Sequence, residues 1–177
     1  MSTVSLSLGS NCRPQFYINN ALTALAEHFG ELQISSVFES EAIGFDGDNF
    51  LNLVVVIDTQ LSLAQLAQQL KAIEDDNDRD RSGPKFSGRT LDIDILTYDD
   101  LHGEFSGIRL PRNEVLSNAF VLWPLAQLLP GKTHPEAGKT YAQLWQEYDK
   151  SRQRLWVIDF EWNGRKVSSS TDASAQD

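Results

Sequence analysis

The segment FLNLVVVI, at residues 50–57, is a nearly continuous apolar run near the middle of the first half of the chain. A strand with only one buried face would alternate apolar and polar side chains, and this run does not alternate. We therefore predict a strand that is buried on both faces and lies in the centre of a β-sheet.

Two further strands and a helix are predicted on the N-terminal side of this run. Residues 3–8 alternate apolar and polar side chains, as a half-buried strand does, and residues 9–11 (GSN) are predicted to turn the chain. Residues 14–29 carry apolar side chains at helical spacing and are followed by Gly30, which is typical of a helix end. Residues 32–38 are predicted as a second strand.

A second helix and a fourth strand are predicted on the C-terminal side. The helix spans residues 62–77, where Ser62 and Gln65 resemble a capping box, and the strand spans residues 91–97. The order strand, helix, strand, strand, helix, strand is the split βαβ pattern. We therefore predict the α+β class: a ferredoxin-like βαββαβ antiparallel sheet with helices packed on one face.

The last third of the chain is predicted to form shorter elements. They are a connection with an edge strand at 99–109, a short helix interrupted near Pro124 at 120–129, a helix at 141–148 and a strand at 154–162. We predict a single domain over residues 1–166. Residues 167–177 (VSSSTDASAQD) are small and polar, which predicts a disordered tail.

The composition excludes several classes of protein. The chain has 177 residues, with 15 Lys and Arg against 25 Asp and Glu, so its net charge is −10. This charge disfavours nucleic acid or an anionic membrane as a partner, and any anionic ligand needs a local basic site or a bridging metal. No apolar run is long enough to span a membrane, no signal peptide is recognisable and Cys12 has no disulfide partner, so we expect a cytoplasmic protein, monomeric by default.

Asp92 and Asp94 are the first candidate site residues. Strand periodicity places their carboxylates on one face, about 7 Å apart, while Ile93 points to the other face. Hard oxygen ligands at this spacing suit Mg²⁺, which keeps several waters and completes its shell with substrate phosphates. The alternative is a solvated strand face, with Arg89 as an ordinary ion-pair partner of either carboxylate.

The segment before this strand is rich in basic side chains. Arg79, Arg81, Lys85 and Arg89 lie within eleven residues, in a segment that has no periodicity and is predicted to be a mobile loop. Guanidinium groups on such a loop can close over a polyphosphate. Alternatively, the loop is solvated and the neighbouring aspartates neutralise its arginines.

Phe50 and Asn52 share one face of the predicted central strand. An amide within an apolar run needs hydrogen-bond partners. It can complete a neighbouring backbone, or it can read the edge of a flat heterocycle that stacks on Phe50.

Several of these motifs together resemble the 6-hydroxymethyl-7,8-dihydropterin pyrophosphokinase family of folate biosynthesis. The resemblance runs in order from about residue 4 to residue 129. It rests on the segments GSN at 9–11, FLN at 50–52, Glu74, the Arg79/Arg81 loop, GRTLDIDIL at 88–96 and AFVLWPL at 119–125.

The resemblance implies an enzyme that transfers diphosphate from ATP to the hydroxymethyl group of the pterin and releases AMP, using two Mg²⁺ ions. The implied metal ligands are Asp92 and Asp94, with Asp94 also catalytic. The implied pterin site consists of Ser40, Ile43, Phe50, Asn52 and Phe120. Glu74, Arg89 and Arg112 fall on or near nucleotide-binding positions, and Arg79, Arg81 and Arg89 are implied to be catalytic.

The chain departs from the family pattern close to the expected triphosphate. Arg112 stands where the family has His, and Asn118 stands where it has Arg. Asn118 cannot replace a guanidinium, so we expect weaker ATP binding or slower turnover than in a typical member. A paralogue with altered or lost activity is therefore an alternative.

A second alternative is a ferredoxin-like module that stacks single-stranded RNA on Phe50. Such a module needs a basic sheet face and the RNP pattern of aromatic side chains, and the sequence has neither. The histidines, His28, His102 and His134, lie far apart and are predicted to be on the surface.

Overall fold

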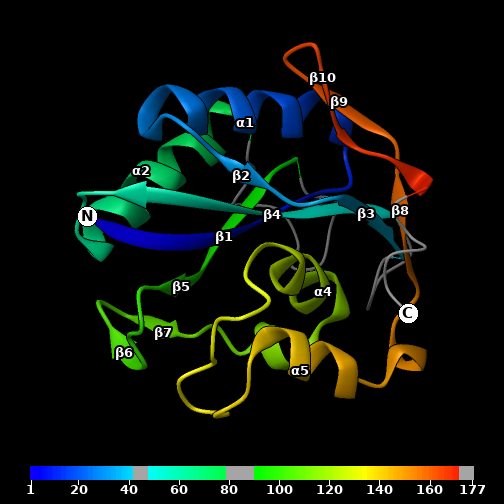
Figure 1. The fold of residues 1–177 in the computed structure, drawn as a ribbon. Coiled ribbons are helices and arrows are strands. Elements are labelled where there is room, and N and C mark those ends of the chain that lie inside the picture. Colours follow the sequence, from blue (N-terminus) through cyan, green and yellow to red (C-terminus); the bar gives the residue numbers. More distant parts are fainter. Residues whose placement is uncertain (42–47, 79–89, 172–177) are drawn as a thin grey trace.

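The computed structural model describes residues 1–41, 48–78 and 90–171, and its centre is an antiparallel sheet (Figure 1). The order of the strands is β5-β1-β4-β3-β8, with the short β2 also paired to β4. The four strands predicted from the sequence are therefore not adjacent in chain order. The fourth predicted strand lies beside the first, the first beside the third, and the third beside the second. The strands are β1 (Ser2–Ser10), β2 (Gln33–Ile34), β3 (Val37–Ser40), β4 (Phe50–Thr59), β5 (Asp92–Tyr98) and β8 (Leu155–Ile158). The predicted ferredoxin-like α+β fold and the central position of residues 50–57 are confirmed.

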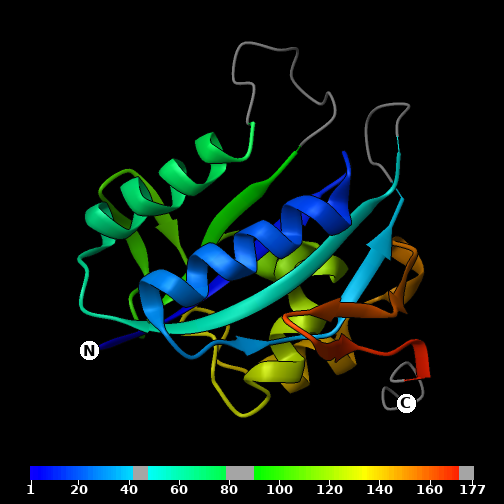
Figure 2. The ribbon, with the colours of Figure 1, turned by 90° about the horizontal axis from the view of Figure 1, so that it is seen from above.

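Helices cover both faces of this sheet. Helices α1 (Pro14–Phe29) and α2 (Leu63–Asp76) lie on one face, and α4 (Ala119–Leu128) and α5 (Tyr141–Glu147) lie on the other (Figures 1 and 2). The two helices of the predicted βαββαβ pattern share one face, as expected. The later helices, which the pattern does not place, cover the other face because β4 is apolar on both sides. Val55 packs in the core with α1 and α2, whereas its neighbour Val54 packs in a second core with α4 and α5.

Local sequence determines where α2 begins, whereas packing determines that α4 continues through a proline. The predicted capping box of α2 is confirmed: the Ser62 hydroxyl accepts from the Gln65 N–H, and the Gln65 side chain accepts from the Ser62 N–H. By contrast, α4 continues through Pro124, where an interruption was predicted. The flanking side chains of α4 are buried between the sheet and α5, and this packing outweighs the missing Pro N–H.

Residues 99–109 form no edge strand of the main sheet, contrary to the prediction. Instead, β6 (Gly103–Phe105) and β7 (Ile108–Leu110) pair with each other as a separate hairpin. The short helix α3 (Glu114–Ser117) follows this hairpin and leads into α4.

Residues 154–162, predicted as one strand, form two short strands, and a third strand follows them. The chain passes through a 3-10 turn (Lys150–Arg152) into β8, breaks at Asp159, and continues as β9 (Phe160–Trp162) and β10 (Arg165–Ser168). β8 pairs with β3, whereas β9 pairs with β10. The Asp159 carboxylate accepts the Ser170 N–H at 2.9 Å, which holds the returning chain beside the break.

The residues that follow 166 are ordered further than predicted. Ser168 is 2% exposed, and its hydroxyl accepts from the Val37 N–H and donates to the Ile158 carbonyl. The prediction of disorder is therefore wrong for residues 167–171, since a buried serine ties them to β3 and β8. Residues 172–177 lie outside the described part of the chain.

His134 is buried, although a surface position was predicted for it, whereas His28 and His102 are exposed as expected. Its Nδ1 accepts the backbone N–H groups of Glu136 and Ala137. Burial is the main cause that lowers the pKa of His134 below 6.5. Protonation of Nδ1 would in addition displace two backbone donors.

This environment predicts a stability that depends on pH. Because the folded pKa of His134 is depressed, the unfolded chain binds more protons, and stability falls as the pH drops below about 6.5. We expect His134→Asn, whose Oδ1 can replace Nδ1 as acceptor, to lose less stability than the wild type between pH 7 and pH 5. Urea titrations of both proteins across this range measure the difference, and parallel curves would contradict the prediction.

Candidate active site

Asp92 and Asp94 project from the same face of β5, as strand periodicity predicts. The side chains between and after them, Ile93 and Ile95, are buried in the core beneath α1 and α2. Asp92 pairs with Gly9 of β1 and Asp94 pairs with Ser7. The Asp94 side chain is 44% exposed, so its carboxylate is accessible to a ligand.

Gly9 lies between the acid pair and Asn52. It pairs with Asp92 on one side and with Asn52 of β4 on the other, so all three positions open onto the same face of the sheet. A Cβ on Gly9 would lie 3.3 Å from the Asn52 Oδ1 atom, and its absence leaves room above the strand. The predicted turn at residues 9–11 begins later than expected, because β1 stays paired through Ser10.

Asn52 is held by the neighbouring strand. The side chain is 5% exposed, and its Nδ2 donates to the Ser40 hydroxyl at 2.7 Å. Phe50 pairs with Ser40 across the same two strands and shares the face of Asn52. The sheet therefore brings Ser40, Phe50 and Asn52 together, as the predicted site requires.

Phe120 lies at the start of α4, on the side of the sheet that carries Asn52. It is the second residue of α4 and packs against the core that contains Phe38. Phe38 pairs with Asn52 in the sheet and belongs to this core, so α4 and the amide lie on the same face of β3 and β4.

Glu74 lies behind the acid pair. It is 8% exposed near the end of α2, and its Oε2 accepts the Ile93 N–H at 2.8 Å. This contact fixes the end of α2 against the backbone between the two aspartates.

The Tyr17 hydroxyl donates to the Asp78 carboxylate at 2.7 Å, and this bond, with burial, raises the pKa of Tyr17.

Arg112 lies beside Asp94. Its Nη2 is 3.7 Å from the Asp94 Oδ1, and its Nε is 3.1 Å from the Glu114 Oε2. The Arg112 N–H donates to the Leu96 carbonyl, which holds the residue against β5. A cation and the acid pair therefore share one end of this strand.

Four predicted site residues lie outside the described part of the chain: Ile43, Arg79, Arg81 and Arg89. Within the described part, no group of three or more His, Cys, Asp or Glu side chains could hold a metal. The donor set of Asp92 and Asp94 nevertheless suits Mg²⁺, which often takes one or two protein carboxylates and fills its shell with water and phosphate.

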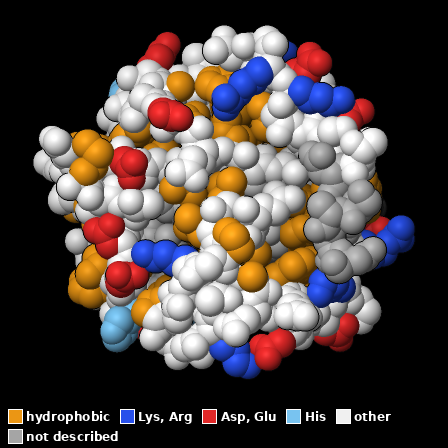
Figure 3. All heavy atoms as spheres, viewed as in Figure 1, with side chains coloured by type: hydrophobic (Ala, Val, Ile, Leu, Met, Phe, Trp, Pro, Cys, Tyr) orange, Lys and Arg blue, Asp and Glu red, His pale blue; other side chains and the backbone are white. Residues whose placement is uncertain are grey.

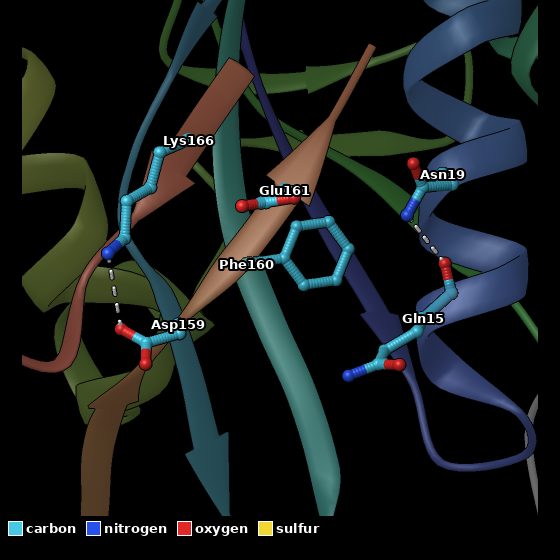
Figure 4. A pocket seen from close by; sticks show the side chains of 6 residues that line it. All are labelled: Gln15, Asn19, Asp159, Phe160, Glu161 and Lys166. Carbon is cyan, nitrogen blue, oxygen red and sulfur yellow. Dashed lines mark hydrogen bonds and ion pairs between the residues drawn. The ribbon is translucent and has the colours of Figure 1, made fainter. Parts of the chain in front are cut away.

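Two hollows lie away from these residues. One, of about 380 Å³, lies between α1 and the β9–β10 hairpin (Figure 4), and its lining residues are Gln15, Asn19, Asp159, Phe160, Glu161 and Lys166. Another, of about 330 Å³, has a lining of Trp123, Trp145, Lys150, Gln153, Arg154, Leu155 and Trp156. Neither contains a predicted site residue.

On the face seen in Figure 3, Lys and Arg side chains are scattered among acidic and apolar ones.

Among the helices of the described residues, none is long and apolar enough to cross a membrane.

The strand order and the polar end of the sheet define a ferredoxin-like α+β domain with carboxylates, a buried amide and aromatic rings on one face. The model of the 7,8-dihydro-6-hydroxymethylpterin-pyrophosphokinase (HPPK) family matches residues 5–130, and the chain belongs to this family.

Individual relatives agree with this assignment. The 2-amino-4-hydroxy-6-hydroxymethyldihydropteridine pyrophosphokinase of Aquifex aeolicus is 35% identical over 137 residues, covering 76% of this chain and 85% of the relative. The Synechocystis enzyme of the same name is 34% identical over 147 residues, covering 81% of this chain and 75% of the relative. The bifunctional protein FolKE of Lactococcus lactis is 32% identical over 167 residues, covering 89% of this chain, and this chain spans 46% of that protein.

Solved structures share the fold. The Plasmodium falciparum wild-type HPPK-DHPS structure superposes with a TM-score of 0.70 at 13% identity, covering 94% of this chain and 50% of that chain. At this identity the likeness concerns the fold alone.

Proposed function

We propose that this chain transfers the terminal diphosphate of ATP to the hydroxymethyl group of 6-hydroxymethyl-7,8-dihydropterin and releases AMP, a step of folate biosynthesis. The observation that carries the proposal is the row Asn52, Gly9, Asp92 across three neighbouring strands. Strands lie about 4.8 Å apart, so the amide and the carboxylate stand about 10 Å apart on the same face of the sheet. A flat bicycle read by Asn52 would thus extend its substituent towards the acid pair.

The pterin ring would bind at the β3–β4 end of this face. Asn52 would pair with the polar edge of the ring, and its bond to Ser40 orients the amide for this role. Phe50 and Phe120 would stack on the two faces of the ring, and Ile43 would complete the site. A buried amide with a fixed orientation discriminates strongly against ligands that lack matching groups.

The nucleotide would bind at the β5 end. Asp92 and Asp94 would hold two Mg²⁺ ions, which when bound supply positive charge to the phosphate oxygens. Glu74, Arg89 and Arg112 would contact the nucleotide, and Arg79 and Arg81 would close over its phosphates.

The reaction joins the pterin hydroxymethyl oxygen to the β-phosphorus. The bond between that phosphorus and the oxygen shared with the α-phosphate breaks, AMP leaves with the bond electrons, and the hydroxyl proton is lost. Such transfers depend on positioning and on cationic stabilisation of the phosphate oxygens. Arg112 lies where it can contribute positive charge beside Asp94.

The decisive experiment measures AMP formation from ATP and Mg²⁺ with and without the hydroxymethyl pterin. We expect AMP to form in equal amount to the pterin consumed, and to stop when EDTA removes the metal. Pterin-independent or absent AMP formation at saturating substrates would overturn the proposal and favour a paralogue with altered or lost activity. A cytoplasmic location and a monomeric state remain predictions.

A further inference from the structure

Two side chains beyond the family match reach the junction between α3 and α4. The Tyr148 hydroxyl donates to the Ser117 carbonyl at 2.8 Å. Gln153 makes two contacts: its Oε1 accepts the Ala119 N–H at 2.6 Å, and its Nε2 donates to the Asn118 Oδ1 at 3.2 Å. Both ends of the Gln153 amide are therefore engaged at the junction between α3 and α4.

The first N–H groups of a helix lack partners within the helix, and the N-cap side chain usually supplies one. At α4 the N-cap residue, Asn118, makes no side-chain cap bond to its own helix. Gln153 supplies the acceptor to Ala119 instead, from a segment 34 residues further along the chain. The Asn118 oxygen is engaged by the same glutamine.

The same segment also contacts the other side of the proposed pterin site. Leu155, two residues after Gln153, pairs with Ser40 in the sheet. Ser40 in turn accepts the hydrogen bond from Asn52. Residues 153–155 thus connect the start of α4, where Phe120 follows Ala119, to the strand that orients the buried amide.

We propose that Gln153 is a positioning residue for the pterin site, holding the start of α4 so that Phe120 stays over the strands that carry Asn52. This inference rests on the proposed function. It also explains Asn118, which stands where the family pattern has Arg: in this chain the position links α4 to the C-terminal segment. A guanidinium has no acceptor to offer the Gln153 Nε2, so the two contacts cannot both persist with Arg there.

The test compares Gln153→Ala with Gln153→Glu. The alanine variant loses both contacts, so we expect its KM for the pterin to rise about tenfold, with kcat and the KM for ATP within about threefold of the wild type. The glutamate variant keeps an acceptor for the Ala119 N–H, and the Asn118 amide can rotate to donate to it. We therefore expect Gln153→Glu to restore the pterin KM to within about threefold. Hydrogen exchange at the Ala119 amide should accelerate in the alanine variant only.

Gln143→Ala is the matched control. Gln143 Oε1 accepts the Thr140 N–H at the start of α5, so this variant loses a cap of the same chemistry on the neighbouring helix. We expect its pterin KM to be unchanged. An active wild type with an unchanged pterin KM in Gln153→Ala, or an equal rise in Gln143→Ala, overturns the positioning role alone. A wild type that neither turns over nor binds the pterin overturns the proposed function, and this inference with it.

Discussion

Asp94→Asn is expected to lower kcat by about a thousandfold and to leave the fold intact. The substitution keeps the size of the side chain and removes the charge that is proposed to hold Mg²⁺ and the phosphates. Asp94 is 44% exposed, and its 3.7 Å contact with Arg112 is a surface ion pair. Loss of such a pair costs less than about 1 kcal/mol, so the unfolding midpoint should change little.

Asp58→Asn is the control for this prediction. Asp58 lies in the same sheet, near the end of β4 that is remote from Asn52. Its carboxylate accepts a hydrogen bond from the Thr3 hydroxyl. We expect it to retain activity within about twofold, since surface substitutions away from the site have small effects. Stopped-flow or coupled AMP assays at several Mg²⁺ concentrations measure both variants. If Asp94→Asn kept more than about a tenth of wild-type kcat, the role proposed for this carboxylate would be wrong.

Asn52→Ala is expected to lower kcat/KM for the pterin by about a hundredfold or more, with little change in the KM for ATP. The buried amide is proposed to make several hydrogen bonds to the ring edge, each worth about 1 kcal/mol or more. Truncation also leaves the Ser40 hydroxyl without its 2.7 Å donor. Kinetics at saturating ATP and varied pterin give the measurement.

Ser40→Ala tests how much the orientation of the Asn52 amide, apart from its presence, contributes to pterin binding. This variant keeps the Asn52 amide and removes the contact that orients it, so we expect a loss of about tenfold in kcat/KM for the pterin. Asn19→Ala on α1 is a control, because Asn19 contacts only its own helix in the described hydrogen bonds. Equal effects of Asn52→Ala on ATP and pterin would show that the amide does not read the pterin.

The central part of the fold could be predicted because it follows from local periodicity. The run at 50–57 is apolar on both sides and is the middle of the sheet. A second buried face follows from the same run, but the helix that covers it was not predicted, although α4 is apolar around its whole circumference, as a helix packed between two layers is. The break at Asp159 could not be predicted, because no Gly or Pro marks it in the sequence and its contact with Ser170 forms only in the folded chain.

The site, too, has features that follow from neighbouring residues in the sequence and features that depend on distant contacts. Period-two alternation correctly placed Asp92 and Asp94 on one face, since it depends on neighbours in sequence. The pairing of Asn52 with Ser40, and the position of Gly9 between Asn52 and Asp92, depend on strand register, which no local pattern specifies. Gln153 was missed for the same reason, because a glutamine carries no signal until its distant partners at 118 and 119 are known.

β8 matters for any attempt to shorten the chain. Trimming after residue 130, where the family match stops, would remove the partner of β3 and leave the outer N–H and C=O groups of Val37–Ser40 exposed to other molecules. It would also uncover Phe38 by removing Val157, with which it shares a core. A bare strand edge beside a newly exposed aromatic ring recruits further copies by edge-to-edge association, so a fragment that ends there would aggregate rather than fold as a monomer.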